Sequence, residues 1–154
     1  SKKNYGIDGC SAPQYAFTIE KLGKALSNLL NSYNGNFEYS ENIQTIINAI
    51  LDNPTFIGGS KNLDSNLIKI SNRNIFCKGG AEGVFLFVHL KKEIFGILKV
   101  KDGNERALSS AMNALLKKFK ILDKEELNQF NSWNTSSMYN HAKIKIGSIS
   151  TKIE

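Results

Sequence analysis

Residues 84–90, with the sequence V-F-L-F-V-H-L, constrain the fold of this chain more than any other segment. Apolar side chains occupy almost every position, so a strand built from them needs cover on both faces and belongs at the centre of a sheet. Residues 75–78 and 94–100 are also rich in β-branched and aromatic side chains. The polar link Lys91–Glu93 is short enough to join the central run to residues 94–100 as an antiparallel hairpin.

Two amphipathic helices are predicted in the first third of the chain. Thr18 is placed to cap the first, whose apolar series keeps to one face and consists of Ile19, Leu22, Leu26, Leu29 and Leu30. Ser40 is placed to cap the second, and Asn53-Pro54 ends it, because the residue before a proline disfavours the helical conformation. Both helices should turn their apolar faces to a shared core.

Three further helical patterns and a last strand complete the predicted elements. A turn at Gly58-Gly59 leads to a short helix with Asp64 near its start. Residues 101–119 predict a long helix with a capping box formed by Asp102 and Glu105, and residues 123–130 predict a weaker one. After a linker around Trp133, residues 142–150 alternate isoleucine and lysine as an edge strand does.

The predicted fold class is α+β, with an antiparallel sheet and helices packed on it, in a single domain spanning residues 1–154. A chain of 154 residues can bury roughly two thirds of its unfolded surface. Hydrophobic residues make up 41% and charged residues 22%, which is near the globular average. The chain is therefore expected to fold rather than to stay disordered.

Charge and composition argue against several partners. The net charge is +6, but the lysines are scattered and no basic and aromatic stripe accompanies them, so nucleic-acid binding is not expected. No apolar run approaches the ~20 residues of a membrane helix, and the first ten residues have no signal-peptide pattern. Cys10 and Cys77 stand far apart without a C-x-x-C pair, which favours a reducing compartment and hence a cytoplasmic location.

Lys78, followed by Gly79 and Gly80, is the most suggestive local motif. It does not fit a phosphate-binding loop, because the lysine precedes the glycines and a β-rich run follows instead of a helix. It does loosely match the K-T-G arrangement in which a serine hydrolase places an ammonium on the inner edge of a sheet. The alternative is an ordinary β-turn carrying a solvated lysine.

The other reactive side chains carry weaker signals. His89 lies inside an apolar run and His141 has no acidic or cysteine partner nearby, so each is better explained as a structural or surface residue. Isolated cysteines and histidines lack zinc-ligand spacing, and we expect neither a metal nor a cofactor. The chain contains no S-x-x-K motif. Thr18 and Lys21 have a similar spacing, which a helix cap explains more simply.

Five elements in the same order resemble the L-asparaginase II family, the rhizobial-type asparaginases. They cover nearly the whole chain and read GIDGCSAPQYAFTIEKLGKAL, NPTFIGGSKNLDSNLI, CKGGAEGVF, GILKVKDGNERAL and NHAKIKIGSI. The third resembles the family's K-x-GAEG element. Ala142, in the last, stands where a glycine is usual, which puts only the local geometry of the final strand in doubt.

The resemblance implies an amidohydrolase that splits L-asparagine into L-aspartate and ammonia by serine and lysine chemistry on a serine β-lactamase-like fold. Family members are about twice as long, and their S-x-x-K motif lies upstream of the D-G-C segment. The chain is therefore expected to be the carboxy-terminal portion of such an enzyme, with the amino-terminal half missing, and to be inactive alone because lysine without an acceptor serine cannot carry out acyl transfer.

The resemblance also assigns site residues. Lys78 falls on the family's second active-site lysine, and Gly79 and Gly80 fall on a substrate-facing turn. Asp8 matches the acidic residue of the D-G-C turn, and Asp64 is expected on the substrate side as well. Asp64 stands where some rhizobial-type members carry a metal-binding cysteine, which argues against the same zinc site here.

The rival hypothesis is a non-catalytic interaction or oligomerisation module, kept after loss of the catalytic half, with a homo-oligomer as one of its forms. The reading frame preceding Ser1 discriminates between the two, because the enzyme hypothesis requires an S-x-x-K motif there.

Overall fold

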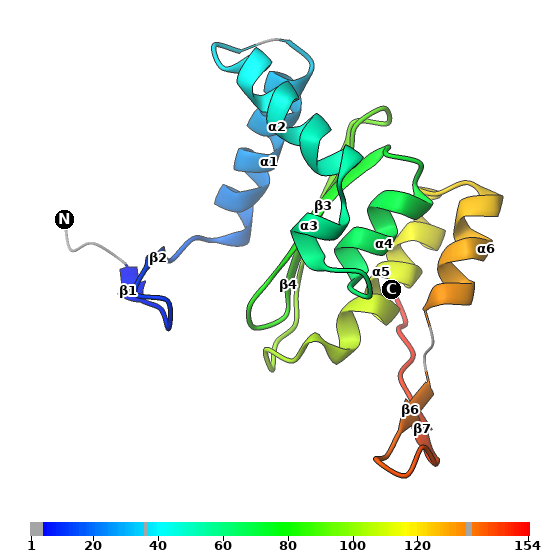
Figure 1. Cartoon of the computed structure of the whole chain (residues 1–154). Helices are drawn as coiled ribbons and strands as arrows, with labels where there is room; N and C mark the ends of the chain where they lie inside the picture. The colour runs from blue at the N-terminus through cyan, green and yellow to red at the C-terminus, as the bar shows by residue number, and fades with distance from the viewer. Residues whose placement is uncertain (1–4, 36, 135–136) are drawn as a thin grey trace.

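The computed structural model describes residues 5–35, 37–134 and 137–154, and Figure 1 shows the arrangement of its elements. In chain order these are β1 (Tyr5–Ile7), β2 (Pro13–Tyr15), α1 (Ile19–Tyr33), α2 (Ser40–Asp52), α3 (Thr55–Gly58), α4 (Leu63–Ile70), β3 (Ile75–Gly80), β4 (Val84–His89), β5 (Ile94–Lys99), the 3-10 turn η1 (Glu105–Ala107), α5 (Leu108–Lys118), α6 (Lys124–Trp133), β6 (Ser137–Tyr139) and β7 (Lys145–Ser148).

The central sheet has three antiparallel strands in the order β3-β4-β5, which confirms the predicted central strand and the α+β class. In the register of the sheet, Phe87 of β4 lies between Cys77 of β3 and Gly96 of β5. A Cβ atom at Gly96 would overlap the Phe87 ring, so the glycine leaves room for the aromatic side chain. Phe87 is consequently buried in the core.

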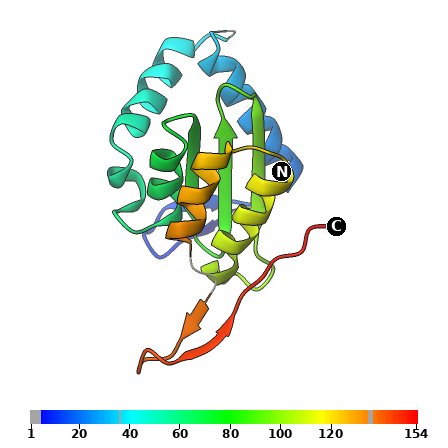
Figure 2. The same ribbon diagram turned by 90° about the vertical axis from the view of Figure 1, so that its right-hand side faces the viewer.

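Helices cover both faces of this sheet. In Figure 2, α5 and α6 lie in front of the strands and α1 lies behind them. Gly23 of α1 approaches the ring of Phe95 in β5, while the backbone of α4 accepts a hydrogen bond from Cys77 in β3. Successive side chains of a strand point to opposite faces of the sheet, so each strand contributes apolar side chains to both faces. These side chains and those of the helices form one cluster of buried apolar residues.

The long helix predicted over residues 101–119 is wrong at its start. Gly103 has a φ of +76°, and the chain is still turning away from β5 at this point, so η1 precedes a shorter α5. The predicted capping box of Asp102 and Glu105 is also wrong. Asn104 caps η1 by accepting from the N–H of Arg106, and Asp102 pairs with the Arg106 guanidinium at 2.5 Å.

A capping box does occur at the start of α6, which the sequence predicted only as a weak helix. Asp123 accepts from the N–H of Glu126, and the Glu126 carboxylate accepts from the N–H of Asp123. The helix continues through Trp133, which had been assigned to a linker. The predicted final strand is confirmed in part as β7, which pairs with β6 in a hairpin that was not predicted.

The first two helices differ from expectation by small amounts. Thr18 caps α1 as predicted, accepting from the N–H of Lys21 at 3.3 Å. Ser40 is the first residue of α2 rather than its cap, because its hydroxyl bonds back to Phe37. Asn53 ends α2 as predicted, and α3 follows Pro54 at once where only a turn had been expected.

Two hairpins extend away from the body of the molecule as arms, β1–β2 near the amino terminus and β6–β7 near the carboxy terminus (Figure 1). Both are short, and their apolar side chains are largely exposed. After β7 the chain returns to the body, where the hydroxyls of Thr151 and Ser110 lie 2.9 Å apart. Among the described helices, none combines the length and hydropathy that crossing a membrane requires.

Candidate active site

The lysine and glycines of the K-G-G motif lie within a strand. β3 continues through Gly80, and Gly79 and Gly80 pair with Phe85 and Val84 of β4. The prediction that these glycines form a turn is wrong, because the run that follows offers backbone partners for both; the turn is one step later, at residues 81–83. The β-turn in the alternative for Lys78 is wrong for the same reason, but its other part, a solvated lysine, stays an alternative because the Lys78 side chain is 46% exposed.

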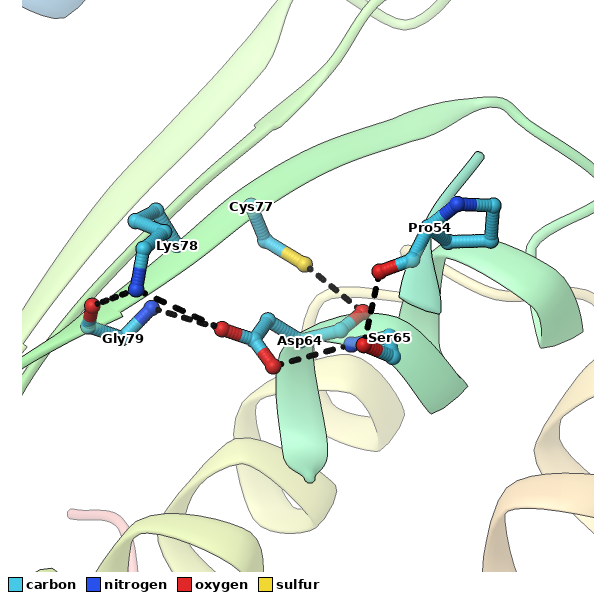
Figure 3. A network of polar contacts seen from close by, with 6 residues as sticks. All are labelled: Pro54, Asp64, Ser65, Cys77, Lys78 and Gly79. Atoms are coloured by element: carbon cyan, nitrogen blue, oxygen red, sulfur yellow. Dashed lines mark hydrogen bonds and ion pairs between the residues drawn. The ribbon is translucent and has the colours of Figure 1, made fainter. Parts of the chain in front are cut away.

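Lys78 reaches from β3 to the beginning of α4 (Figure 3). Its ammonium donates to the carbonyl oxygen of Gly79 at 2.5 Å and lies 3.7 Å from the Oδ2 atom of Asp64. The Lys78 side chain is 46% exposed, whereas that of Asp64 is 6% exposed. The ion pair therefore joins an accessible cation to a carboxylate that the protein almost encloses.

The Asp64 carboxylate is held by backbone groups of two elements. Its Oδ1 atom accepts from the N–H of Ser65 at 3.0 Å, and its Oδ2 atom accepts from the N–H of Gly79 at 3.3 Å. Space for it comes from Gly58, where any Cβ atom would overlap the carboxylate. Gly59, with a φ of +81°, then redirects the chain in a conformation that suits glycine.

These groups line an open pocket of about 770 Å³. Its walls come from the end of β3, from α3 and the loop before α4, from the start of α5, and from Trp133 at the end of α6. Lys78, Asp64, Gly79 and Gly80, four of the five predicted site residues, are all on this wall. The pocket thus brings together residues from three of the five sequence elements, and the four predicted site residues come from two of them.

The fifth predicted residue, Asp8, lies elsewhere. It stands in the turn between β1 and β2, where its carboxylate accepts from the backbone N–H groups of Cys10 and Ala12 and from the side chain of Gln14. These hydrogen bonds, that from Ala12 foremost, lower the pKa of Asp8. Asp8 is not on the pocket wall, so in this chain it acts as a turn cap, and a role beside the active site stays a prediction.

Cys77, the residue before Lys78 in β3, contacts Asp64 as well. Its thiol is fully buried and donates to the backbone carbonyl of Asp64 at 3.4 Å. Burial raises the pKa of this thiol well above its usual range, and the Asp64 charge adds to the effect. A protonated, enclosed thiol is a poor nucleophile, so Cys77 contributes packing rather than chemistry.

The histidines fit the structural explanation given for them. His89 is buried, and its Nδ1 atom accepts from the backbone N–H of Lys92 at 3.2 Å. His141 lies on the exposed turn between β6 and β7. Within residues 5–35, 37–134 and 137–154, no group of three or more histidine, cysteine, aspartate or glutamate side chains is placed to bind a metal ion.

Chemically, the pocket offers a cation, a carboxylate and exposed backbone near two glycines. Ser109 contributes to its wall at the start of α5, but among the described residues no hydroxyl is hydrogen-bonded to Lys78. Ser109, Trp133 and the part played by Gly58 were not predicted from the sequence. Only Gly58 carried a signal, as half of a Gly-Gly pair a few residues before an aspartate.

Comparison with known proteins gives one family match. The family model described as L-asparaginase II matches residues 1–151. A search of curated proteins returned no match.

Proposed function

This chain belongs to the L-asparaginase II family, and we propose that it forms the carboxy-terminal portion of an enzyme that hydrolyses L-asparagine to L-aspartate and ammonia. The observation that supports this most directly is the Lys78–Asp64 pair on the wall of the open pocket. Lys78 belongs to the element that resembles the family's K-x-GAEG motif, and its half-exposed ammonium can reach a bound amide.

In the proposed reaction, a serine hydroxyl attacks the amide carbon of asparagine. The serine loses its proton, ammonia leaves after gaining one, and water then cleaves the acyl-enzyme ester to release aspartate. Lys78 is the residue of this chain that we assign to moving a proton in these steps. Gly79 and Gly80 have no side chain beyond the backbone, so a substrate can approach β3 closely there.

The acceptor serine and its S-x-x-K motif are proposed to come from polypeptide outside this sequence, because no S-x-x-K occurs in the 154 residues. The other half would complete a serine β-lactamase-like fold around the same pocket. In that complete fold, the turn between β1 and β2 would bring Asp8 of this chain to the site. We propose no metal and no cofactor. A cytoplasmic location is proposed from the two unpaired cysteines.

The test is ammonia release from L-asparagine by this chain alone and by this chain produced together with the polypeptide encoded directly upstream. The chain alone should give background ammonia, and the combination should give turnover. Turnover by the chain alone would contradict the two-part arrangement. A folded combination that contains S-x-x-K but is inactive on both L-asparagine and L-glutamine would contradict the amidohydrolase proposal.

A second candidate is a non-catalytic interaction or oligomerisation module, which the exposed apolar side chains of the arms favour. Ile7, Tyr15 and Phe17 are 65%, 56% and 68% exposed near β1–β2, and Ile144 and Ile146 are 61% and 62% exposed near β7. Light scattering during size exclusion separates the candidates. The module is supported if the chain forms a stable homo-oligomer and the reading frame preceding Ser1 encodes no S-x-x-K motif. The enzyme is supported if the chain is a monomer that gains turnover with the upstream polypeptide.

A further inference from the structure

The carboxylate of Asp64 has an environment that its position in sequence does not explain. An aspartate in the first turn of a helix is usually solvated, yet Asp64 is only 4% exposed. Each of its oxygens is already bonded to a backbone N–H, that of Ser65 or that of Gly79. A buried carboxylate needs such partners, because an unpaired charge in the interior is costly.

The backbone that carries this carboxylate is itself held in place. The carbonyl oxygen of Asp64 accepts from the Cys77 thiol, and the hydroxyl of Ser65 donates to the carbonyl oxygen of Pro54 at 2.8 Å (Figure 3). Gly58 supplies the space, since a side chain there would overlap the Asp64 carboxylate. Three elements, α3, α4 and β3, therefore determine where the negative charge lies.

Lys78 is different, because its side chain is long and 46% exposed. Such a side chain loses rotamer entropy when it is fixed in one position. Its ammonium contacts the Gly79 carbonyl oxygen and Asp64, which is the charged partner.

We propose that Asp64 is a positioning residue: it holds the Lys78 ammonium and the N–H of Gly79 at the edge of the pocket and does not bind substrate itself. The inference rests on the proposed function only in taking Lys78 as the catalytic amine. Asp64 was expected on the substrate side, but a carboxylate with both oxygens occupied and 4% exposure has little left to offer a ligand.

The test measures the acetylation rate of the Lys78 amine by acetic anhydride in the intact folded chain, with Lys91 as internal reference and mass spectrometry as readout. A Lys78 side chain that is paired with Asp64 is less free to meet the reagent than an unpaired one. Asp64→Asn should therefore raise the Lys78 rate about two- to fivefold, the range of a partly exposed ion pair. Circular dichroism confirms folding, and Asp64→Ser replaces the variant if Asp64→Asn does not fold.

Two further variants make the test specific. Gly58→Ala leaves Asp64 in the chain but displaces its carboxylate, so it should raise the Lys78 rate in the same way. Asp52→Asn removes the exposed partner of Arg73 instead and should leave the Lys78 rate unchanged. An unchanged rate in Asp64→Asn, or an equal rise in Asp52→Asn, overturns the proposal.

Kinetics in the active two-part enzyme distinguish positioning from substrate binding. A positioning role lowers kcat in Asp64→Asn and leaves KM for L-asparagine nearly unchanged, whereas a raised KM with unchanged kcat overturns the proposal. If the enzyme proposal itself fails and there is no turnover, the acetylation result still decides whether Asp64 positions Lys78. The two failures are thus separable.

Discussion

Lys78 combines accessibility with a defined charge partner. Its side chain is 46% exposed, and its ammonium is 3.7 Å from Asp64 rather than enclosed in an apolar cleft. The sequence analysis placed this lysine by its neighbours Gly79 and Gly80, whereas the structure adds a carboxylate brought from another element. At the residue scale, the chemistry proposed for this chain therefore depends on a contact between residues 14 positions apart.

Replacing Lys78 with methionine tests its catalytic role. Loss of a positioned acid or base typically costs ~10²- to 10⁴-fold in rate, so Lys78→Met should lower kcat of the two-part enzyme by about that factor. Because Lys78→Met also leaves the nearly enclosed Asp64 carboxylate without its charged partner, circular dichroism should confirm that the variant is folded. Lys91→Met, in the exposed link between β4 and β5, is the control and should be silent. More than half of the wild-type turnover in Lys78→Met would remove the catalytic assignment.

His89 should make stability depend on pH. Burial, followed by the charge of Lys92, lowers the pKa of His89 below 6.5. The unfolded state then binds a proton more readily than the folded state, so the contribution of His89 is fully present above about pH 6.5 and is lost as the pH falls through its lowered value. The free energy of unfolding, measured between about pH 8 and about pH 5.5, should fall less in His89→Gln than in the wild type.

A matched histidine serves as the control for this measurement. His141 is exposed, so His141→Gln should keep the pH dependence of the wild type. Glutamine at position 89 can still accept the hydrogen bond from the Lys92 N–H, which separates loss of the titrating group from loss of the bond. An identical pH slope in the wild type and in His89→Gln would show that the buried imidazole is not the source.

Helix boundaries in this chain depend on which polar side chain reaches which backbone N–H. The Asp123 and Glu126 pair forms a reciprocal capping box at α6. The similar pair Asp102 and Glu105 does not, because the chain at Gly103 has not yet entered a helix. The spacing of two acidic residues is therefore not enough to predict a capping box, because the backbone must also enter the helix at the first of them.

Removing the α6 cap should have a measurable cost. Asp123→Ala leaves the N–H of Glu126 without its side-chain acceptor, and loss of an N-cap typically costs about 1 kcal/mol. Asn62→Ala is the comparison, because Asn62 occupies the N-cap of α4 without a side-chain bond to it and should cost under ~0.5 kcal/mol. Chemical denaturation of both variants gives the values. Equal costs would mean that the α6 capping box contributes nothing beyond a generic substitution.

The whole molecule consists of a packed body and two arms. The body contains the three-stranded sheet and the helices on its faces, with Val88, Met112 and Leu116 at 0% exposure. The arms are the hairpins β1–β2 and β6–β7, whose strands are three or four residues long. An isolated two-stranded hairpin is at best marginally stable in water, so the arms should open independently of the body.

Hydrogen exchange should show this division directly. Amides of β1, β2, β6 and β7 should exchange through local opening, at least about tenfold faster than those of β4, which should require global unfolding. Adding the upstream polypeptide should slow exchange in any arm that packs against it. Equal protection of arms and β4 in the chain alone would contradict the division, and a broad unfolding transition with dye binding would show that the body needs a partner to complete its core.

The sequence by itself determined the parts that depend on local chemistry. The continuous apolar content of residues 84–90 predicted a central strand covered on both faces, and the spacing of the series after Thr18 predicted a helix with one buried face. Five ordered elements were also enough to predict the family, which the match over residues 1–151 confirms.

Only the tertiary structure decided which residues meet. Gly79 and Gly80 became strand because β4 offered them backbone partners, and Asp64 became a buried partner of Lys78 because α4 packs beside β3. Asp8 stayed on its own turn, away from the pocket. Contacts between elements depend on how each buries its apolar face against the others, and no spacing within one segment records that arrangement.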